Sequence, residues 1–137
     1  MKELQIRSEV CVGCGSCELA CIVAHSPGRN LLSAVSEEQS PRKRIIIKAQ
    51  QEGNIPHLCH HCEEMPCVHA CRMGAMYRDE MGFAQVDEKE CIGCWLCIKA
   101  CPYDAITKGE NRKIIKCDAC KDNGYEKACV SACPTFA

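Results

Sequence analysis

Sixteen cysteines in a chain of 137 residues fall into four ordered groups of four, and no other feature of the sequence limits its fold as strongly. The first and third groups share the spacing C-x2-C-x2-C-x3-C, while the second and fourth widen the middle gap. The four quartets are Cys11, Cys14, Cys17 and Cys21; Cys59, Cys62, Cys67 and Cys71; Cys91, Cys94, Cys97 and Cys101; and Cys117, Cys120, Cys129 and Cys133. An internal repeat of this kind predicts a series of metal sites.

The spacing C-x2-C-x2-C-x3-C is typical of 4Fe-4S sites in which the fourth cysteine binds a neighbouring cluster. The first three thiols form a tight loop that can meet three corners of one cluster. Gly13, Gly15 and Gly93 permit the close backbone approach that such a loop needs. We therefore predict four 4Fe-4S clusters, with each quartet giving its last cysteine to a partner quartet. We expect that last cysteine on the first turn of a helix.

A structural zinc-binding protein is the main alternative to this interpretation. Structural zinc sites combine two separated C-x2-C pairs, a pattern that the first and third quartets do not follow. A disulfide scaffold requires an oxidising compartment, and residues 1–7 contain no apolar or twin-arginine export signal. We therefore expect a reducing cytoplasm. No stretch approaches the ~20 apolar residues of a membrane span.

Composition favours an interior filled by clusters rather than by large side chains. The hydrophobic fraction of 47% includes the sixteen cysteines, and the chain has only one Trp, three Tyr and two Phe. A net charge of -1 gives no reason to expect a nucleic-acid partner. The chain has neither a phosphate loop nor a dinucleotide motif, and every quartet is complete, so we predict an electron carrier rather than an enzyme.

The segments between the quartets contain short strand, turn and helix signals. Runs rich in β-branched residues favour strands, and clusters that contain Gly, Asn or Asp favour turns. The cysteine-free region from Ser26 is interpreted as an insertion. We expect a strand at 44–48, hairpins that join 75–78 to 83–87 and 105–107 to 113–115, and short helices after Cys17, Cys67 and Cys97.

Several side chains near the quartets are candidates for tuning or docking rather than for binding iron. Five histidines invite a metal-ligand interpretation, but because the quartets already supply sixteen ligands, we interpret His60 and His61 as loop residues that pack or hydrogen-bond beside a cluster. Trp95 and Tyr103 are interpreted as hydrophobic lids. The charged runs 42–44, 63–64 and 87–88 are solvated faces or docking patches. The histidines are His25, His57, His60, His61 and His69.

The four quartets resemble those of a known group, the four-cluster ferredoxin-like electron-transfer subunits of bacterial and archaeal redox enzymes. The resemblance extends from Cys11 to Pro134, and the order of quartet spacings is its most specific part. The stretch 59–67, with the segments 74–79 and 91–97, is most similar to the iron-sulfur protein associated with carbon monoxide dehydrogenase. Related subunits serve formate dehydrogenases, hydrogenlyases, and molybdopterin or tungstopterin oxidoreductases.

This resemblance implies an α+β fold of two ferredoxin-like lobes, each with two clusters, the second inserted in the first. The outer lobe would comprise residues 1–25 and 106–137, the insertion 26–56, and the inner lobe 57–105. It also implies that the first quartet pairs with the fourth and the second with the third. The expected ligands are Cys11, Cys14, Cys17 and Cys133 for cluster 1; Cys117, Cys120, Cys129 and Cys21 for cluster 2; Cys59, Cys62, Cys67 and Cys101 for cluster 3; and Cys91, Cys94, Cys97 and Cys71 for cluster 4.

The same resemblance implies a role between two redox partners. One partner would be a catalytic oxidoreductase, either a carbon monoxide dehydrogenase, a formate dehydrogenase, a hydrogenase, or a tungsten or molybdenum enzyme. The other would be a flavoprotein or hydrogenase, and we expect a hetero-oligomer. The sequence ends at Ala137 without the anchor helix that some relatives carry, so we expect a soluble complex with no direct membrane span.

Overall fold

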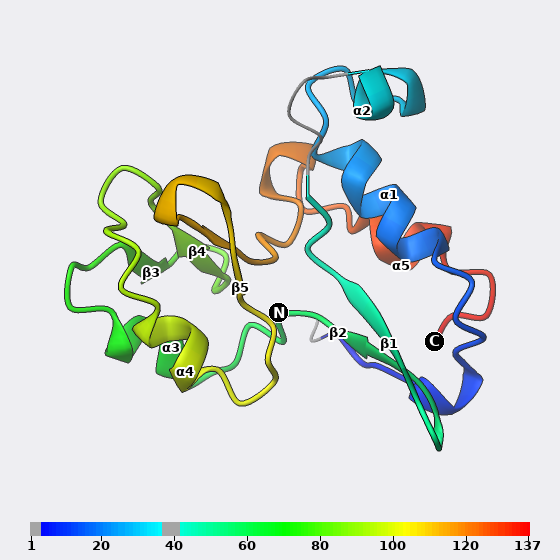
Figure 1. Ribbon diagram of the computed structural model, residues 1–137, viewed down its shortest axis with the longest axis horizontal. Helices are drawn as coiled ribbons and strands as arrows, with labels where there is room; N and C mark the ends of the chain where they lie inside the picture. Colours follow the sequence, from blue (N-terminus) through cyan, green and yellow to red (C-terminus); the bar gives the residue numbers. More distant parts are fainter. Residues whose placement is uncertain (1–3, 37–41) are drawn as a thin grey trace. The chain divides into compact units, whose positions relative to one another are not determined.

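A computed structural model describes residues 4–36 and 42–137, which form a small α+β structure of short helices and two-stranded hairpins (Figure 1). Within these residues no helix combines the length and the hydropathy that a membrane crossing requires. The helices are α1 (Ser16–Ala24), α2 (Leu31–Ser36), α3 (Pro66–Ala70), α4 (Leu96–Ala100) and α5 (Ala128–Ala132), with short 3-10 turns at Ser8–Val10, Glu110–Arg112 and Lys121–Asn123. The strands are β1 (Ile46–Gln50), β2 (Gly53–His57), β3 (Met76–Arg78), β4 (Ala84–Val86), β5 (Thr107–Lys108) and β6 (Ile114–Ile115).

The strands pair in sequence order as three separate antiparallel hairpins. The two hairpins expected around 79–82 and 108–112 are confirmed as β3–β4 and β5–β6, with Met76 opposite Val86 and Thr107 opposite Ile115. The strand expected at 44–48 begins two residues later. Its partner, β2, was not expected, because Asn54 and Pro56 are typical of turns and strand edges.

Three of the helices are preceded by a residue in the left-handed conformation, at the same position of the quartet. The residue two positions before the third cysteine of a quartet has positive φ at Gly15 (74°), Met65 (42°) and Trp95 (61°). Because the gap between second and third cysteine is short in these quartets, the chain must turn sharply before the helix starts. In the fourth quartet the gap of eight residues relieves this need, and Lys127 is extended.

The expectation that the fourth cysteine lies on the first turn of a helix is wrong. The third cysteine occupies that turn, and Cys71, Cys101 and Cys133 end the helices α3, α4 and α5 in extended conformation. For Cys101 and Cys133 the following proline favours this conformation, because it disfavours helical backbone in the residue before it. Cys71 adopts it before Arg72, without a proline, whereas Cys21 lies inside α1.

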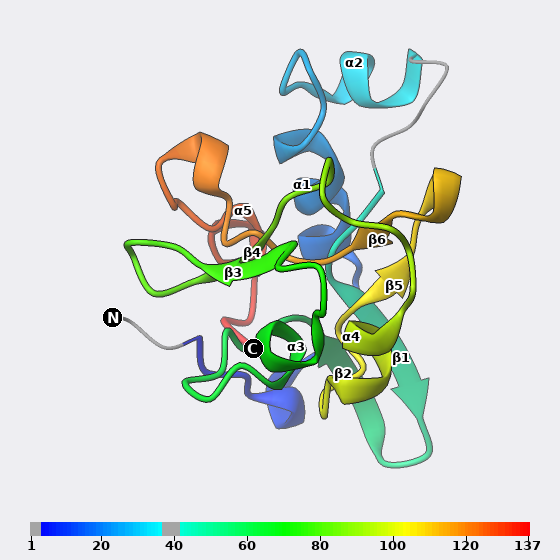
Figure 2. The ribbon, with the colours of Figure 1, turned by 90° about the vertical axis from the view of Figure 1, so that its left-hand side faces the viewer.

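The chain divides into two compact units. Unit 1 consists of residues 58–118 with Leu4, and unit 2 consists of 5–57 with 119–137. The β5–β6 hairpin belongs to unit 1, although the sequence suggested the outer lobe for it, because Ile106 and Ile114 pack in the core of that unit. This core also holds Met65, Cys67, Met76, Ala84 and Cys97, and α3 lies against α4 (Figure 2).

Unit 2 is built on the pair of helices α1 and α5, which lie side by side in Figure 1, and on the β1–β2 hairpin. The Glu18 carboxylate on α1 accepts a hydrogen bond from the Ile47 N–H at 2.8 Å, and the Asn54 amide donates to the Cys11 carbonyl at 3.3 Å. The region expected to be an insertion therefore supports the first quartet directly.

Replacement of Gly93 by alanine should destabilise unit 1 strongly. Its φ is +73°, and a Cβ atom would lie 2.0 Å from the Arg112 carbonyl oxygen. Gly74 has φ +66° with open space around it, so Gly74→Ala is the control. It should lose only the free energy of unfolding that a left-handed residue with a Cβ costs, about 1–2 kcal/mol. Anaerobic guanidinium unfolding should show a clearly larger loss for Gly93→Ala. Equal midpoints would mean that the Arg112 segment moves aside freely.

Candidate functional site

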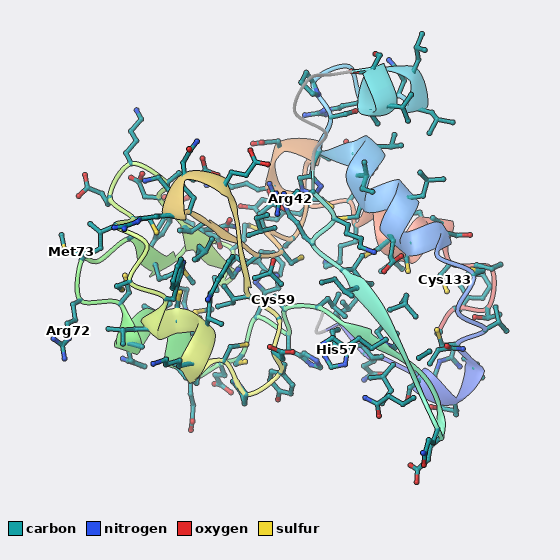
Figure 3. All side chains as sticks on the ribbon, viewed as in Figure 1. Arg42, His57, Cys59, Arg72, Met73 and Cys133 are labelled. Atoms are coloured by element: carbon teal, nitrogen blue, oxygen red, sulfur yellow. The ribbon has the colours of Figure 1, made fainter. Side chains whose placement is uncertain are left out.

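None of the sixteen cysteines, all of which lie in described residues, forms a disulfide. The cysteines differ in how far they are exposed to solvent. Cys14 and Cys94, the second cysteines of the first and third quartets, are exposed, whereas Cys21, Cys59 and Cys67 are buried. Cys59 belongs to unit 1 and Cys133 to unit 2; both are labelled in Figure 3. The cysteines therefore form several sites, some of which reach the surface.

In unit 1, thiols of the second quartet are influenced by the charge of a cysteine from the third. Burial raises the pKa of Cys62 and of Cys67, and negative charge on Cys59 and Cys101 raises both further. Such repulsion weakens with separation, so these thiols lie near one another. Cys101 comes from the third quartet and the other three from the second.

A second group in unit 1 surrounds a cavity. Cys71, Cys91, Cys94 and Cys97 all line it, together with apolar side chains that include Met76 and Ile114. Burial raises the pKa of Cys97 to about 11, and charge on Cys91, Cys67 and Cys71 adds to the rise. Since Cys67 belongs to the neighbouring group, the two groups meet where α3 packs against α4.

The surroundings of Trp95 indicate whether this cavity can hold a 4Fe-4S cluster. Its indole Nε1 is buried and has no hydrogen-bond partner within the described part of the chain, and its ring lines the cavity. Buried N–H groups are nearly always satisfied, and cluster sulfur accepts such hydrogen bonds. The Lys108 ammonium covers the same ring at 4.1 Å from its centroid. Four thiols and an orphaned donor around one cavity fit a 4Fe-4S cluster.

In unit 2, the last cysteine of the fourth quartet influences two thiols of the first. Burial raises the pKa of Cys17, and charge on Cys133 contributes to the rise. Charge on Cys133 also acts on the exposed Cys14, whose pKa is nevertheless lowered, chiefly by the hydroxyl of Ser16 at 3.3 Å. These contacts bring the last cysteine of the chain to the first quartet.

The other group in unit 2 centres on Cys129. Burial raises the pKa of Cys129 to about 11, and charge on Cys120, Cys21 and Cys17 raises it as well. Thiols with such pKa values are protonated and unreactive at neutral pH when no metal is bound. Iron supplies the positive charge that makes their thiolates stable, so the burial of these cysteines favours metal ligation over thiol chemistry.

Backbone N–H groups point at several of the sulfur atoms. Cys21 Sγ accepts a hydrogen bond from the Arg44 N–H at 3.3 Å, Cys59 Sγ from the His61 N–H at 3.4 Å, and Cys133 Sγ from the Ala137 N–H at 3.3 Å. Such bonds favour the thiolate and help to set the potential of a bound cluster.

The histidines and aromatic residues occupy positions beside these groups. His60 stacks on Tyr103 with ring centroids 3.8 Å apart, and buried His61 contacts Phe83 edge to face at 5.1 Å. His25 Nδ1 lies 2.7 Å from the carbonyl oxygen of Cys21. His60 and His61 thus pack against aromatic rings, as expected, and His25 makes a polar contact within the first quartet that was not expected. Tyr103 is 43% exposed and covers His60.

The basic run 42–44 is partly built into unit 2. The Lys43 ammonium forms an ion pair with Glu18 at 2.9 Å, while the Arg44 backbone donates to Cys21. Arg42 is exposed. Lys43 and Arg44 therefore contribute to the structure around the first quartet.

Sequence reasoning missed one buried charge. Lys116 is 3% exposed, and its Nζ donates to the carbonyl oxygens of Ala84 at 2.5 Å and Cys117 at 2.6 Å. A signal existed, because side chains alternate along extended chain and Lys116 shares the face of buried Ile114. A lysine beside a cysteine motif was simply not expected to point inward.

Comparison with known proteins agrees with this geometry. Residues 51–137 match a family model described as a 4Fe-4S dicluster domain, and residues 8–22 match a 4Fe-4S binding domain. An iron-sulfur protein of Rhodospirillum rubrum is 39% identical, with 93% of this chain and 75% of that protein covered. The electron transport protein HydN of Escherichia coli K12 is 34% identical, with 93% and 80% covered. The thiosulfate reductase electron transfer subunit PhsB of Salmonella typhi is 39% identical, with 93% and 68% covered.

Trp95→Phe should lower the reduction potential of one cluster without loss of iron. The variant keeps an aromatic lid but removes the indole donor, which stabilises the more negative reduced state by about 1 kcal/mol, or roughly 40 mV for one electron. EPR-monitored redox titration measures the shift. Tyr103→Phe, which removes an exposed hydroxyl, is the control. A Trp95→Phe titration that overlays the wild type would mean that the indole is only a lid.

Proposed function

The chain belongs to the 4Fe-4S dicluster family of electron-transfer proteins, and on this premise we propose that it carries electrons through four clusters between a catalytic oxidoreductase subunit and a second redox partner. It is an electron-transfer component rather than a catalytic enzyme. Its sixteen cysteines supply the ligands of four 4Fe-4S clusters. The alternative, a structural zinc protein, lacks support from any of these relatives.

We propose that the ligand sets of the four clusters follow the cross-paired scheme. The observation that supports this proposal best is that Cys71 of the second quartet lines one cavity with Cys91, Cys94 and Cys97 of the third. Charge on Cys101 likewise raises the pKa of Cys62. Cys133 beside Cys17 and Cys21 beside Cys129 support the same scheme. Cys117 is assigned to cluster 2 from its quartet alone. Two lobes with two clusters each follow from this scheme.

When bound, each 4Fe-4S cluster accepts and gives up single electrons. The work of the chain is to hold these groups, exclude water and set their potentials. Buried Cys59 and Cys67 with their apolar neighbours keep water from cluster 3, and backbone N–H groups at Cys21 and Cys133 favour negative charge on sulfur. No side chain needs to move a proton for this function.

Electrons would enter and leave where the ligands reach the surface. Exposed Cys94 is flanked by Ile92, which is 58% exposed, and exposed Cys14 by Val12, which is 64% exposed. Apolar side chains beside a redox centre fit a protein interface. We therefore propose docking faces around clusters 1 and 4, one for each redox partner.

The catalytic partner is proposed to be an oxidoreductase of a small substrate. The sequence resemblance suggests carbon monoxide dehydrogenase, formate dehydrogenase, a hydrogenase, or a tungsten or molybdenum enzyme, and the relative named as a thiosulfate reductase subunit extends this class. A flavoprotein or hydrogenase would be the second partner in a hetero-oligomer. We propose a reducing compartment such as the cytoplasm, because all sixteen thiols are free of disulfides.

Anaerobic metal analysis tests the proposal as a whole. The purified protein should contain about sixteen iron and about sixteen acid-labile sulfide per chain, since four clusters have that content. Reduction should give EPR signals that interact with one another. A colourless protein with about four zinc and no sulfide would establish the structural alternative instead.

Paired alanine substitutions test the ligand scheme. Cys62→Ala with Cys101→Ala removes two ligands from a single cluster, whereas Cys94→Ala with Cys101→Ala removes one ligand from each of two clusters. EPR of the reduced variants should therefore show one altered cluster in the first case and two in the second. If clusters were bound within single quartets, the two results would be exchanged.

A further inference from the structure

The ammonium of Lys116 is a buried charge without a carboxylate partner. Lys116 is the only lysine or arginine that is buried in the described part of the chain. Its hydrogen-bond acceptors are two backbone carbonyl oxygens, and no ion pair to Asp or Glu is formed within residues 4–36 and 42–137. Since lysine is almost never buried unless its charge is balanced, a negative group is needed nearby.

Three hydrogen bonds, joined through the covalent structure of Ala84 and His61, place this ammonium in the same buried region as Cys59. Lys116 Nζ donates to the carbonyl oxygen of Ala84, and the N–H of Ala84 donates to His61 Nδ1 at 3.1 Å. The N–H of His61 donates in turn to Cys59 Sγ at 3.4 Å. Ala84 and His61 are 1% and 6% exposed, so the connection is buried throughout.

The charge also faces the other cysteines of this group. Cys67 packs in the same hydrophobic core as Ala84, the residue that accepts from Lys116. Although burial dominates and raises the pKa of both Cys67 and Cys62, the positive charge of Lys116 opposes the rise at each. Both cysteines belong to cluster 3 in the proposed scheme.

We propose that the ammonium of Lys116 is the counter-charge of the thiolate-bound cluster 3 and raises its reduction potential, so that an electron entering unit 1 comes to rest there. The inference rests on the proposed function and its ligand scheme. A cluster with four thiolates carries about -2 when oxidised and gains one further negative charge with one electron. Lys116 stabilises the more negative state, no proton is transferred, and the electron comes from the proposed redox partner.

The test is an EPR-monitored redox titration of the cluster-loaded full chain with Lys116→Gln. Glutamine can still donate to the carbonyl oxygens of Ala84 and Cys117 but carries no charge. One of the four potentials should fall so that its reduced-to-oxidised ratio drops at least tenfold, which is 59 mV for one electron. The affected signal should be the one that Cys62→Ala with Cys101→Ala alters.

Two control variants separate the charge from other effects. Lys89→Gln removes the same charge from an exposed turn, where salt and water screen it, and should leave all four potentials unchanged. Lys116→Arg keeps the charge and should keep the wild-type potential. A similar fall with Lys116→Arg would overturn the proposal, because packing and not charge would then set the potential.

Iron content separates the remaining outcomes. If Lys116→Gln retains about sixteen iron and its potentials equal those of the wild type, the inference about Lys116 is wrong while the electron-transfer function stands. If Lys116→Gln retains only about twelve iron, the iron content of Lys116→Arg decides between charge and packing. About sixteen iron in Lys116→Arg supports a counter-charge, and about twelve iron in that variant shows a packing role. Wild-type protein without about sixteen iron would instead contradict the proposed function itself.

Discussion

Coordination of iron by cysteine thiolates is the interaction on which this fold depends. Its helices α3, α4 and α5 have five residues each, and β5 and β6 have two, lengths at which neither element is stable alone. Ile45 is the only large aliphatic residue buried in the described part of unit 2. A core this small cannot offset the entropy of ordering the chain, so metal binding must supply much of the folding free energy.

This dependence explains why strained backbone recurs at equivalent places. Met65 and Trp95 are not glycines, yet both take the left-handed conformation of Gly15 two residues before a third cysteine. The short loop between the ligands imposes the left-handed backbone at this position, and the side chain there has a separate packing role. Met65 fills the core of unit 1, and Trp95 lines the cavity of cluster 4. Ligand geometry thus overrides local preference.

The sequence was informative where spacing or turn chemistry alone determines the result. Quartet spacing predicted the cofactor, and the turn after Arg78 predicted β3–β4. The β2 strand and the ends of the five-residue helices were harder to predict from the sequence. Pro56 is unfavourable in strands, and the ends of short helices depend on tertiary contacts. The inward orientation of Lys116 was not predicted, because a buried lysine only makes sense once its anionic neighbour is placed.

Two sites in unit 1 have the same ligand chemistry but different surroundings, and this difference gives the electron path a direction. The site proposed for cluster 4 includes exposed Cys94, so nearby charges there are screened by water. The site proposed for cluster 3 includes buried Cys59 and Cys67 and faces a buried ammonium. A charge acts far more strongly in a low-dielectric interior than in water. Lys116 can therefore separate the reduction potentials of the two neighbouring clusters although both have four cysteine ligands. Burial, rather than ligand identity, then distinguishes the site that receives an electron from the site that stores it.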